Sequence, residues 1–185
     1  MKKNLFTALM MTVTTTVLLG IIYPLAVTVM AQVVFPRKAN GQLIEVNGTS
    51  VGSRIIGQAF ISPRYFHSRP SAVSYDPTNS NGSQLGPTNE KLVDRVRADV
   101  ATAQGDAPGV PVPIDLVTTS ASGFDPEISP GAAEFQVARV ARERGLTESK
   151  IRELVARYTS QRQWGLLGEP RVNVLELNLA LDQAR

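Results

Sequence analysis

The pattern of apolar and polar positions divides the chain into an uncharged N-terminal run and a longer mixed part. No charged residue occurs from Asn4 to Pro36, and a helix needs only about 20 apolar residues to cross a bilayer core. A cleaved signal peptide ending at Ala31 is the competing interpretation, but signal h-regions span only about 7–15 residues. The pattern therefore predicts a retained membrane helix in residues 1–36. Pro24 is expected to kink this helix or to end its regular part.

Small side chains follow one face of the predicted membrane helix. Ala8, Thr12, Thr16 and Gly20 recur every four residues and so form one ridge. In lipid, small residues let two helices approach closely, and hydroxyls bond across the contact. The ridge predicts docking against a helix of a larger partner. A lipid-facing helix whose threonines bond only their own backbone is the alternative.

Short strands are predicted after the membrane helix. The stretch "QLIEVNGTSVGS" alternates around Asn47-Gly48, which is the strongest short signal for a β-hairpin. We expect a third strand in "RIIGQAF" and a further strand in "IDLVTTSAS". Between them, residues Ile61 to Pro87 are polar and show no periodicity. A loop of this length is usually functional or disordered. The aromatic residues of this stretch predict an ordered loop that docks on the domain.

Four helices are predicted from caps and apolar stripes. Serine before proline is the expected order at a helix start, and asparagine three residues before glutamate resembles a capping box. Helices are predicted to start at Thr88 or Asn89, at Ser129-Pro130, at Thr147, and at Asn173 with Glu176. The second of these helices is predicted to end at Gly145. The predicted buried stripes are Leu92, Val96, Val100 and Ala103; Ala133, Val137, Val140 and Ala141; Ile151, Leu154, Val155 and Tyr158.

The last segment is ambiguous, because leucines alternate through residues 173–184 as they do in a strand. We favour an extended piece up to Val172 followed by a helix.

Taken together, the elements predict an α+β protein. One N-terminal transmembrane helix, residues 1–36, precedes a single mixed α/β soluble domain, residues 37–185, which is long enough for one core.

Composition excludes several kinds of chemistry. The chain has 185 residues, a net charge of +3, no cysteine and one histidine. This charge is too small and scattered to indicate nucleic-acid binding. Without cysteine there is no disulfide, thiol nucleophile or cysteine-ligated metal. A histidine-rich metal site is impossible, and any Ser-His-Asp arrangement must use His67.

Two serine motifs are candidate active sites. "GTSVG" around Ser50 matches the nucleophile-elbow motif, but that motif requires strand, turn and helix, and here a hairpin precedes it and a strand-like stretch follows. In "DLVTTSASGFDPEISPGAAEFQVARVA", Ser120 and Ser122 lie beside Asp125. Asp-Pro and Ser-Pro are turn and cap signals, so we interpret this stretch as a capped turn leading into a helix.

His67 lies in "YFHSRP" between Arg64 and Arg69. Nearby cations favour the neutral imidazole, and no carboxylate close in sequence is available to orient the ring. A packing or hydrogen-bonding role at a loop contact is therefore favoured over that of a catalytic base.

Several blocks resemble the C subunit of the Kdp-type potassium-transporting ATPase, a bacterial inner-membrane pump. They are "GSRIIGQAF", "YFHSRPSAVSYDPTNSNGSQLGPTN", "DLVTTSASGFDPEISPGAAEFQVARVA" and "GEPRVNVLELNLALD". With the N-terminal helix they cover most of the chain in the order of that family. The family's "SGGSNLG" appears here as "SNGSQLG", with Asn81 and Gln84 substituted.

The resemblance implies a non-catalytic subunit that assembles with a potassium-conducting subunit and a P-type ATPase subunit. It implies that this chain stabilises the complex and acts as a catalytic chaperone that raises the ATP affinity of the hydrolysing subunit. No tightly bound cofactor is expected: ATP belongs to the catalytic partner, and potassium is the ion moved by the complex. The chain has no Asp-Lys-Thr-Gly-Thr phosphorylation loop.

Charges flanking the apolar run give a weak orientation. The amino terminus, Lys2 and Lys3 lie before it, and Arg37 and Lys38 after it. The positive-inside rule leans towards a cytoplasmic N-terminus. We expect a single-pass protein of the bacterial cytoplasmic (inner) membrane, in contact with membrane lipid, with its soluble domain outside. Direct contact with cytoplasmic ATP would then be impossible, and any effect on ATP affinity would pass through the partner.

A membrane-anchored extracytoplasmic hydrolase that uses His67 and a single-anchor binding protein remain the alternatives. The positions expected to contact partners or to mark the family are Thr12, Thr16, Gly20, Gln58, Tyr65, Phe66, His67, Arg69, Pro70, Asn89, Ser120, Asp125, Gln136, Arg139, Asn173, Glu176 and Asn178.

Overall fold

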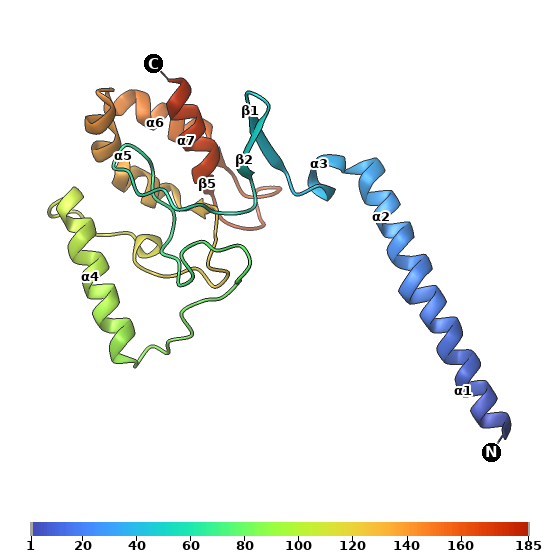
Figure 1. Ribbon diagram of the computed structural model, residues 1–185. Coiled ribbons are helices and arrows are strands. Elements are labelled where there is room, and N and C mark those ends of the chain that lie inside the picture. The colour runs from blue at the N-terminus through green and yellow to red at the C-terminus, as the bar shows by residue number, and fades with distance from the viewer. Residues whose placement is uncertain (1, 185) are drawn as a thin grey trace. The chain divides into compact units, whose positions relative to one another are not determined.

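The computed structural model describes residues 2–184, and the chain forms two compact units that divide between Val51 and Gly52. The first unit contains the apolar helix, and the second contains helices with short strands (Figure 1). This arrangement confirms the predicted α+β class.

The apolar run forms one continuous helical rod from Lys2 to Val34. Its 33 residues correspond to about 50 Å at 1.5 Å per residue, more than the hydrocarbon core of a bilayer requires. Its large apolar side chains are exposed along the whole length, including Leu5 at 73% and Val33 at 76%. Such a surface is suited to lipid.

Pro24 changes the hydrogen bonding of the helix without ending it. Helix α1 (Lys2–Thr15) passes into a π-helical segment (Thr16–Ile22) and then into α2 (Tyr23–Val34). Within the wide turn the N–H of Tyr23 bonds to the carbonyl of Leu18. Proline has no N–H and its ring crowds the carbonyl four residues earlier, and a wider turn relieves that crowding. The predicted interruption of the regular helix therefore lies one turn before the proline.

Threonine hydroxyls in this helix bond to their own backbone. Thr12 Oγ1 donates to the carbonyl of Ala8 at 2.9 Å, and Thr28 does the same to Pro24 at 2.8 Å. A Cβ built on Gly20 would lie 3.9 Å from Thr16 Cγ2, so these two residues of the predicted ridge are neighbours on the helix surface.

A hairpin follows the short helix α3 (Pro36–Ala39). Its strands are β1 (Leu43–Val46) and β2 (Thr49–Ser53). Asn47 and Gly48 both have positive φ, 53° and 76°. Such values at both central residues define the type I′ turn that Asn-Gly favours, so the predicted hairpin is confirmed.

Three helices form the core of the second unit: α5 (Pro130–Arg144), α6 (Glu148–Arg157) and α7 (Val174–Gln183). Each begins at a predicted cap, since the side chains of Ser129, Thr147 and Asn173 accept from N–H groups of the first turn. Gly145 ends α5 in the left-handed conformation (φ 66°). The core residues that these helices contribute are Ala132, Ala133, Val137, Val140, Ala141, Ile151, Leu154, Val155, Val174, Leu177, Ala180 and Leu181.

A small antiparallel sheet joins the helices, in the order β3 (Glu127–Ile128), β5 (Arg171–Asn173) and β4 (Thr159–Ser160). Val172 on the central strand faces Ile128 on one side and Thr159 on the other, and it is fully buried. Strand β5 leads directly into α7. The favoured interpretation of this segment, an extended piece followed by a helix, is therefore correct.

Helix α4 (Glu90–Asp106) lies to one side of the α5–α7 group (Figure 1). Asn89 caps it by accepting from the N–H of Lys91 at 2.9 Å. The predicted stripe is on its inner face, but those side chains are only half-buried.

Two predicted strands are wrong. "RIIGQAF" (residues 54–60) is a turn followed by irregular backbone, and "IDLVTTSAS" (residues 114–122) begins with a 3-10 turn (Ile114–Leu116) and continues through bends. Neither stretch pairs with a strand. Their backbone groups bond individual partners, such as the Gly57 N–H to the Phe124 carbonyl at 2.7 Å. An apolar alternation makes a strand only where another strand is available to pair with it.

Candidate functional site

The loop from Ile61 to Pro87 is held by side chains from two helices. Asn178, on α7 and 1% exposed, binds both backbone groups of Phe66: its Oδ1 accepts from the Phe66 N–H at 2.9 Å, and its Nδ2 donates to the Phe66 carbonyl at 3.0 Å. The Phe66 ring is completely buried in the core. One carboxamide thus replaces the pairing that a neighbouring strand would supply.

The next residue is held in the same way from α5. Gln136 accepts from the His67 N–H at 2.8 Å and donates to the His67 carbonyl at 3.1 Å. One turn further along α5, Arg139 donates to Gln136 Oε1 at 2.7 Å and to the carbonyl of Tyr65 at 3.0 Å. We call the three side chains Asn178, Gln136 and Arg139 the loop clamp. They join segments that are far apart in the sequence.

A second layer of polar contacts lies outside the clamp. Arg144 donates to the Arg64 carbonyl at 2.7 Å and pairs with Asp182 at 2.9 Å. Its guanidinium lies over the Tyr65 ring, 4.8 Å from the centroid, and the Tyr65 hydroxyl donates to Asp182 at 3.0 Å. A cation above an aromatic face adds to the ion pair. The loop is therefore ordered and docked, as its aromatic residues predicted.

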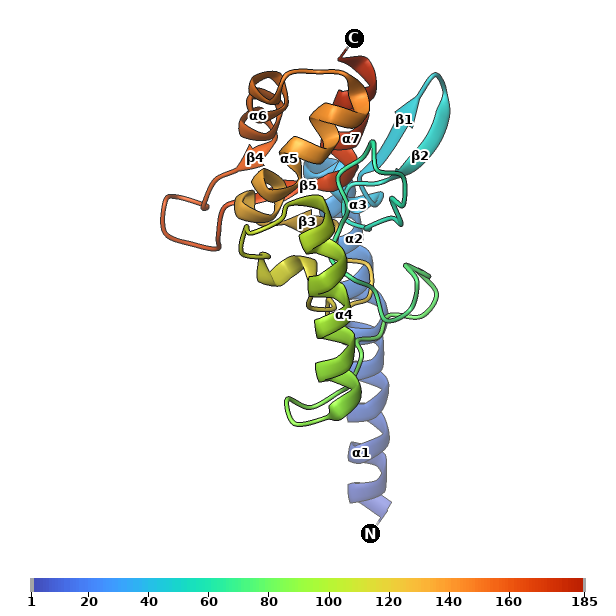
Figure 2. The same ribbon diagram turned by 90° about the vertical axis from the view of Figure 1, so that its left-hand side faces the viewer.

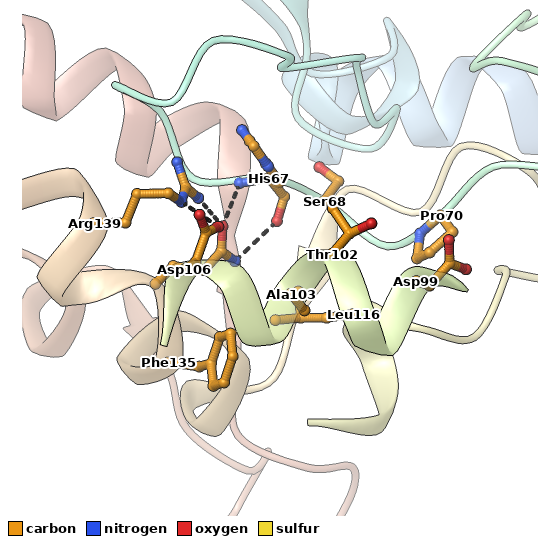
Figure 3. A pocket seen from close by; sticks show the side chains of 11 residues that line it. His67, Ser68, Pro70, Asp99, Thr102, Ala103, Asp106, Leu116, Phe135 and Arg139 are labelled. Atoms are coloured by element: carbon orange, nitrogen blue, oxygen red, sulfur yellow. Dashed lines mark hydrogen bonds and ion pairs between the residues drawn. The ribbon is translucent and has the colours of Figure 1, made fainter. Parts of the chain in front are cut away.

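A cleft of about 220 Å³ lies beside the clamp, between the loop, α4 and α5. Arg139 Nε and Asp106 Oδ2 are 3.0 Å apart at its edge, which ties α4 to α5. Figure 3 shows this ion pair and the bonds to the His67 backbone. The residues that line the cleft are His67, Ser68, Pro70, Asp99, Thr102, Ala103, Asp106, Leu116, Phe135, Gln136 and Arg139.

The surroundings of the His67 ring favour its neutral form. Burial lowers its pKa from the ordinary 6.5, and the charge of Arg139 lowers it further. The neutral imidazole was predicted from the charges of Arg64 and Arg69, whereas in the structure burial and the charge of Arg139 favour it. His67 Nε2 lies 3.1 Å from the Ser62 carbonyl, so this nitrogen carries the proton and donates. An imidazole held in this way orients a loop.

A second cluster joins the same loop to residues 118–125. Arg69 pairs with Asp125 at 3.2 Å and donates to Thr118 Oγ1 at 3.3 Å. Burial raises the pKa of Tyr75 to about 12, so its hydroxyl stays protonated and donates to the Arg69 carbonyl. The substituted residues of "SNGSQLG" bond each other, since Gln84 Nε2 donates to Asn81 Oδ1 at 2.6 Å.

The serines of this region cap turns. Ser120 Oγ accepts from the Gly123 N–H at 2.9 Å, and Ser122 Oγ accepts from the Phe124 N–H at 3.4 Å. Asp125 Oδ1 accepts from the Glu127 N–H at 3.0 Å. Among the contacts of residues 2–184, none joins Ser50, Ser120 or Ser122 to His67. The interpretation as a capped turn is confirmed.

A third cluster surrounds the start of α7. Asn173 Nδ2 donates to the Arg54 carbonyl at 2.8 Å, and Glu176 pairs with the Arg54 guanidinium at 3.1 Å. Gln58 packs over Gly52, where an added Cβ would lie 2.1 Å from Gln58 Nε2. Residues 54–58 are thereby held against α7.

The structure thus brings most of the predicted residues of the second unit into three loop contacts. Tyr65, Phe66, His67, Gln136, Arg139 and Asn178 form one, with Pro70 in the adjoining cleft; Arg69, Ser120 and Asp125 form another; Gln58, Asn173 and Glu176 form the third. Asn89 only caps α4. Sequence reasoning missed Arg144, Asp182 and Asp106, because a charged residue on a helix gives no signal that its partner is a distant loop.

Comparison with known proteins gives consistent matches over 90% or more of the chain. The family model described as the c chain of the K⁺-transporting ATPase matches residues 5–183. The potassium-transporting ATPase KdpC subunit of Koribacter versatilis is 65% identical over 98% of this chain and 95% of its own length. The corresponding subunit of Rhodopseudomonas palustris (strain BisB18) is 51% identical over 100% of both chains. That of Burkholderia mallei is 57% identical over 90% of this chain and 89% of its own.

Proposed function

The chain belongs to the family of the K⁺-transporting ATPase c chain, the KdpC subunit, and from this premise we propose that it is a non-catalytic subunit that stabilises the assembled pump. Its partners are the potassium-conducting subunit and the P-type ATPase subunit of the same complex. It holds no tightly bound cofactor of its own: the catalytic partner binds ATP, and potassium is the transported cargo.

The non-catalytic role is supported by the groups to which the reactive side chains bond. The His67 ring bonds to the Ser62 carbonyl, and Ser120 accepts from the Gly123 N–H. A catalytic serine requires a base within hydrogen-bond reach, and these two residues bond the backbone of their own loops instead. Their contribution is to fix the shape of the surface.

The second unit lies outside the cytoplasmic membrane in this proposal, and the N-terminus lies inside. Lys2 and Lys3 begin a helix that is long enough to span the bilayer, and positive charge favours the cytoplasmic side. Because the chain has no cysteine, a single introduced thiol can report on each side.

Topology is tested with Ala101→Cys, at an exposed position of α4, and with Lys3→Cys. A membrane-impermeant maleimide applied to intact cells should label Ala101→Cys, and Lys3→Cys should react only after the cells are permeabilised. The reverse pattern would place the domain in the cytoplasm and refute the proposed orientation.

In this proposal the chain changes the ATP affinity of the hydrolysing subunit by coupling through that subunit's conformation. A domain outside the membrane does not touch cytoplasmic ATP, so it acts by favouring one conformation of the hydrolysing subunit. Such coupling energies change affinity by about 5–150-fold. The KM for ATP should therefore rise when this chain is removed from the purified complex. A photoreactive ATP analogue should label the catalytic subunit, and labelling of this chain would contradict the proposal.

A further inference from the structure

The loop between β4 and β5 exposes a concentrated group of apolar side chains. Trp164 is 88% exposed, Leu166 81% and Leu167 54%. Figure 2 shows this loop, residues 161–169, projecting from the left edge of the domain. Single exposed apolar residues are ordinary, whereas several together mark an interaction site. We call residues 161–169 the tryptophan finger.

The finger has a defined backbone. Gln163 and Leu167 exchange two backbone hydrogen bonds, of 2.8 and 2.9 Å, across the turn. Trp164 and Gly165 both have positive φ, 54° and 74°. Tryptophan rarely adopts this conformation, and the cross-turn bonds hold it there with its side chain in water. The turn is therefore preorganised to present Trp164.

The base of the finger is electrically neutral. Arg162 pairs with Glu169 at 2.5 Å, and Arg171, at the start of β5, pairs with Glu127 at 2.9 Å. Segments that bind the membrane surface carry unpaired basic residues that are attracted to anionic lipids. A fluid bilayer also gains little from a rigid turn. Both observations favour a protein pocket of fixed shape over lipid.

We propose that the tryptophan finger inserts Trp164 and Leu166 into an apolar pocket on the extracytoplasmic face of a membrane subunit of the same pump. This inference rests on the proposed function, which supplies both the partner and the side of the membrane. Tryptophan is enriched among the few interface residues that carry most of the binding energy. Because the turn is already formed, binding loses little conformational freedom.

The partner is identified by photocrosslinking in the complete complex in native membranes. Trp164→p-benzoylphenylalanine places a photoreactive aromatic group at the tip, and the same replacement at Ala101 measures the background. Irradiation should give an adduct between this chain and a membrane subunit of the pump, identified by mass. Adducts with lipid alone, or no intermolecular adduct, would overturn the inference.

The energetic contribution is measured with Trp164→Ser combined with Leu166→Ser. The matched control, Val110→Ser with Ile114→Ser, removes two other exposed apolar side chains (46% and 73% exposed). Loss of a buried tryptophan anchor should weaken binding to the pump about thirtyfold, whereas the control should bind like the unmodified chain. Neither pair should change the unfolding temperature, because all four side chains lie outside the core.

The two proposals fail in different ways. If the unmodified chain does not co-purify with the pump subunits, the proposed function is wrong. If it co-purifies and the finger variant co-purifies equally well, only the role of the finger is wrong.

Discussion

Asn178→Leu tests the loop clamp directly. Leucine has a similar volume and fills the site, but it removes both bonds to Phe66. The Phe66 N–H and carbonyl are buried and have Asn178 as their partner. The leucine side chain has no donor or acceptor with which to replace the carboxamide.

The magnitude follows from the two orphaned groups. Each buried polar group without a partner costs about 1–3 kcal/mol, and burial of the leucine offsets part of the sum. A net loss of about 3 kcal/mol is a large share of the about 5–15 kcal/mol that stabilises a domain. For a domain of this size it corresponds to a fall of about 10 °C in the unfolding temperature.

The assay is thermal unfolding of the full chain in detergent micelles, followed by circular dichroism. Asn79→Leu, at an exposed position of the same loop, is the matched control and should unfold like the unmodified chain. Hydrogen exchange supplies the local test: the Phe66 amide should be protected in the unmodified chain and exchange rapidly in Asn178→Leu. Equal unfolding temperatures for the variant and the unmodified chain would refute the idea that the carboxamide holds the loop.

Three further predictions concern other parts of the molecule. Gly57→Ala should destabilise the domain by about 1–3 kcal/mol in urea unfolding, because its Cβ would lie 2.4 Å from the Asp125 carbonyl oxygen, whereas Gly86→Ala, with nothing within 4 Å, should be tolerated. The pKa of His67 is lowered in the folded chain, so the unfolded chain takes up a proton at a higher pH than the folded chain does. The free energy of unfolding should therefore fall as the pH drops below about 6.5. The same pH dependence in His67→Gln would contradict this origin. Thr16→Leu with Gly20→Leu should reduce recovery of the complex in mild detergent. Thr14→Leu, which places the same pair of leucines on another face together with the native Leu18, should not reduce it. Equal recovery of both variants would show that the ridge is not the interface.

Features specified by near neighbours in the sequence were predictable. Ser129 caps α5, Thr147 caps α6 and Asn173 caps α7, each through a bond to an N–H three residues later. The Asn47-Gly48 turn likewise needs only its own two residues to adopt positive φ. The length of the uncharged run was enough to predict the membrane helix, because lipid imposes its own requirement on length and composition.

Features that depend on distant partners were not predictable from one sequence. Residues 54–60 carry a strand-like pattern, but the Gly57 N–H bonds a carbonyl in another loop, Phe124. Strands β3, β4 and β5, which form the sheet of the second unit, are two or three residues long, too short to show alternation. His67 was expected at a loop contact, yet its partner Gln136 is separated from it by 69 residues.

The manner in which the loop is fixed bears on the proposed role. Ordering one backbone residue costs about 1–2 kcal/mol, so a long loop that became ordered only on assembly would weaken binding substantially. Here two carboxamides and a guanidinium from α5 and α7 order the loop before any partner arrives. The same helices form the core, so the loop can loosen only if the core is disturbed. In the proposed role, the surface that this loop contributes is therefore fixed by the subunit's own folding, and the free energy of contact remains available to favour one state of the pump.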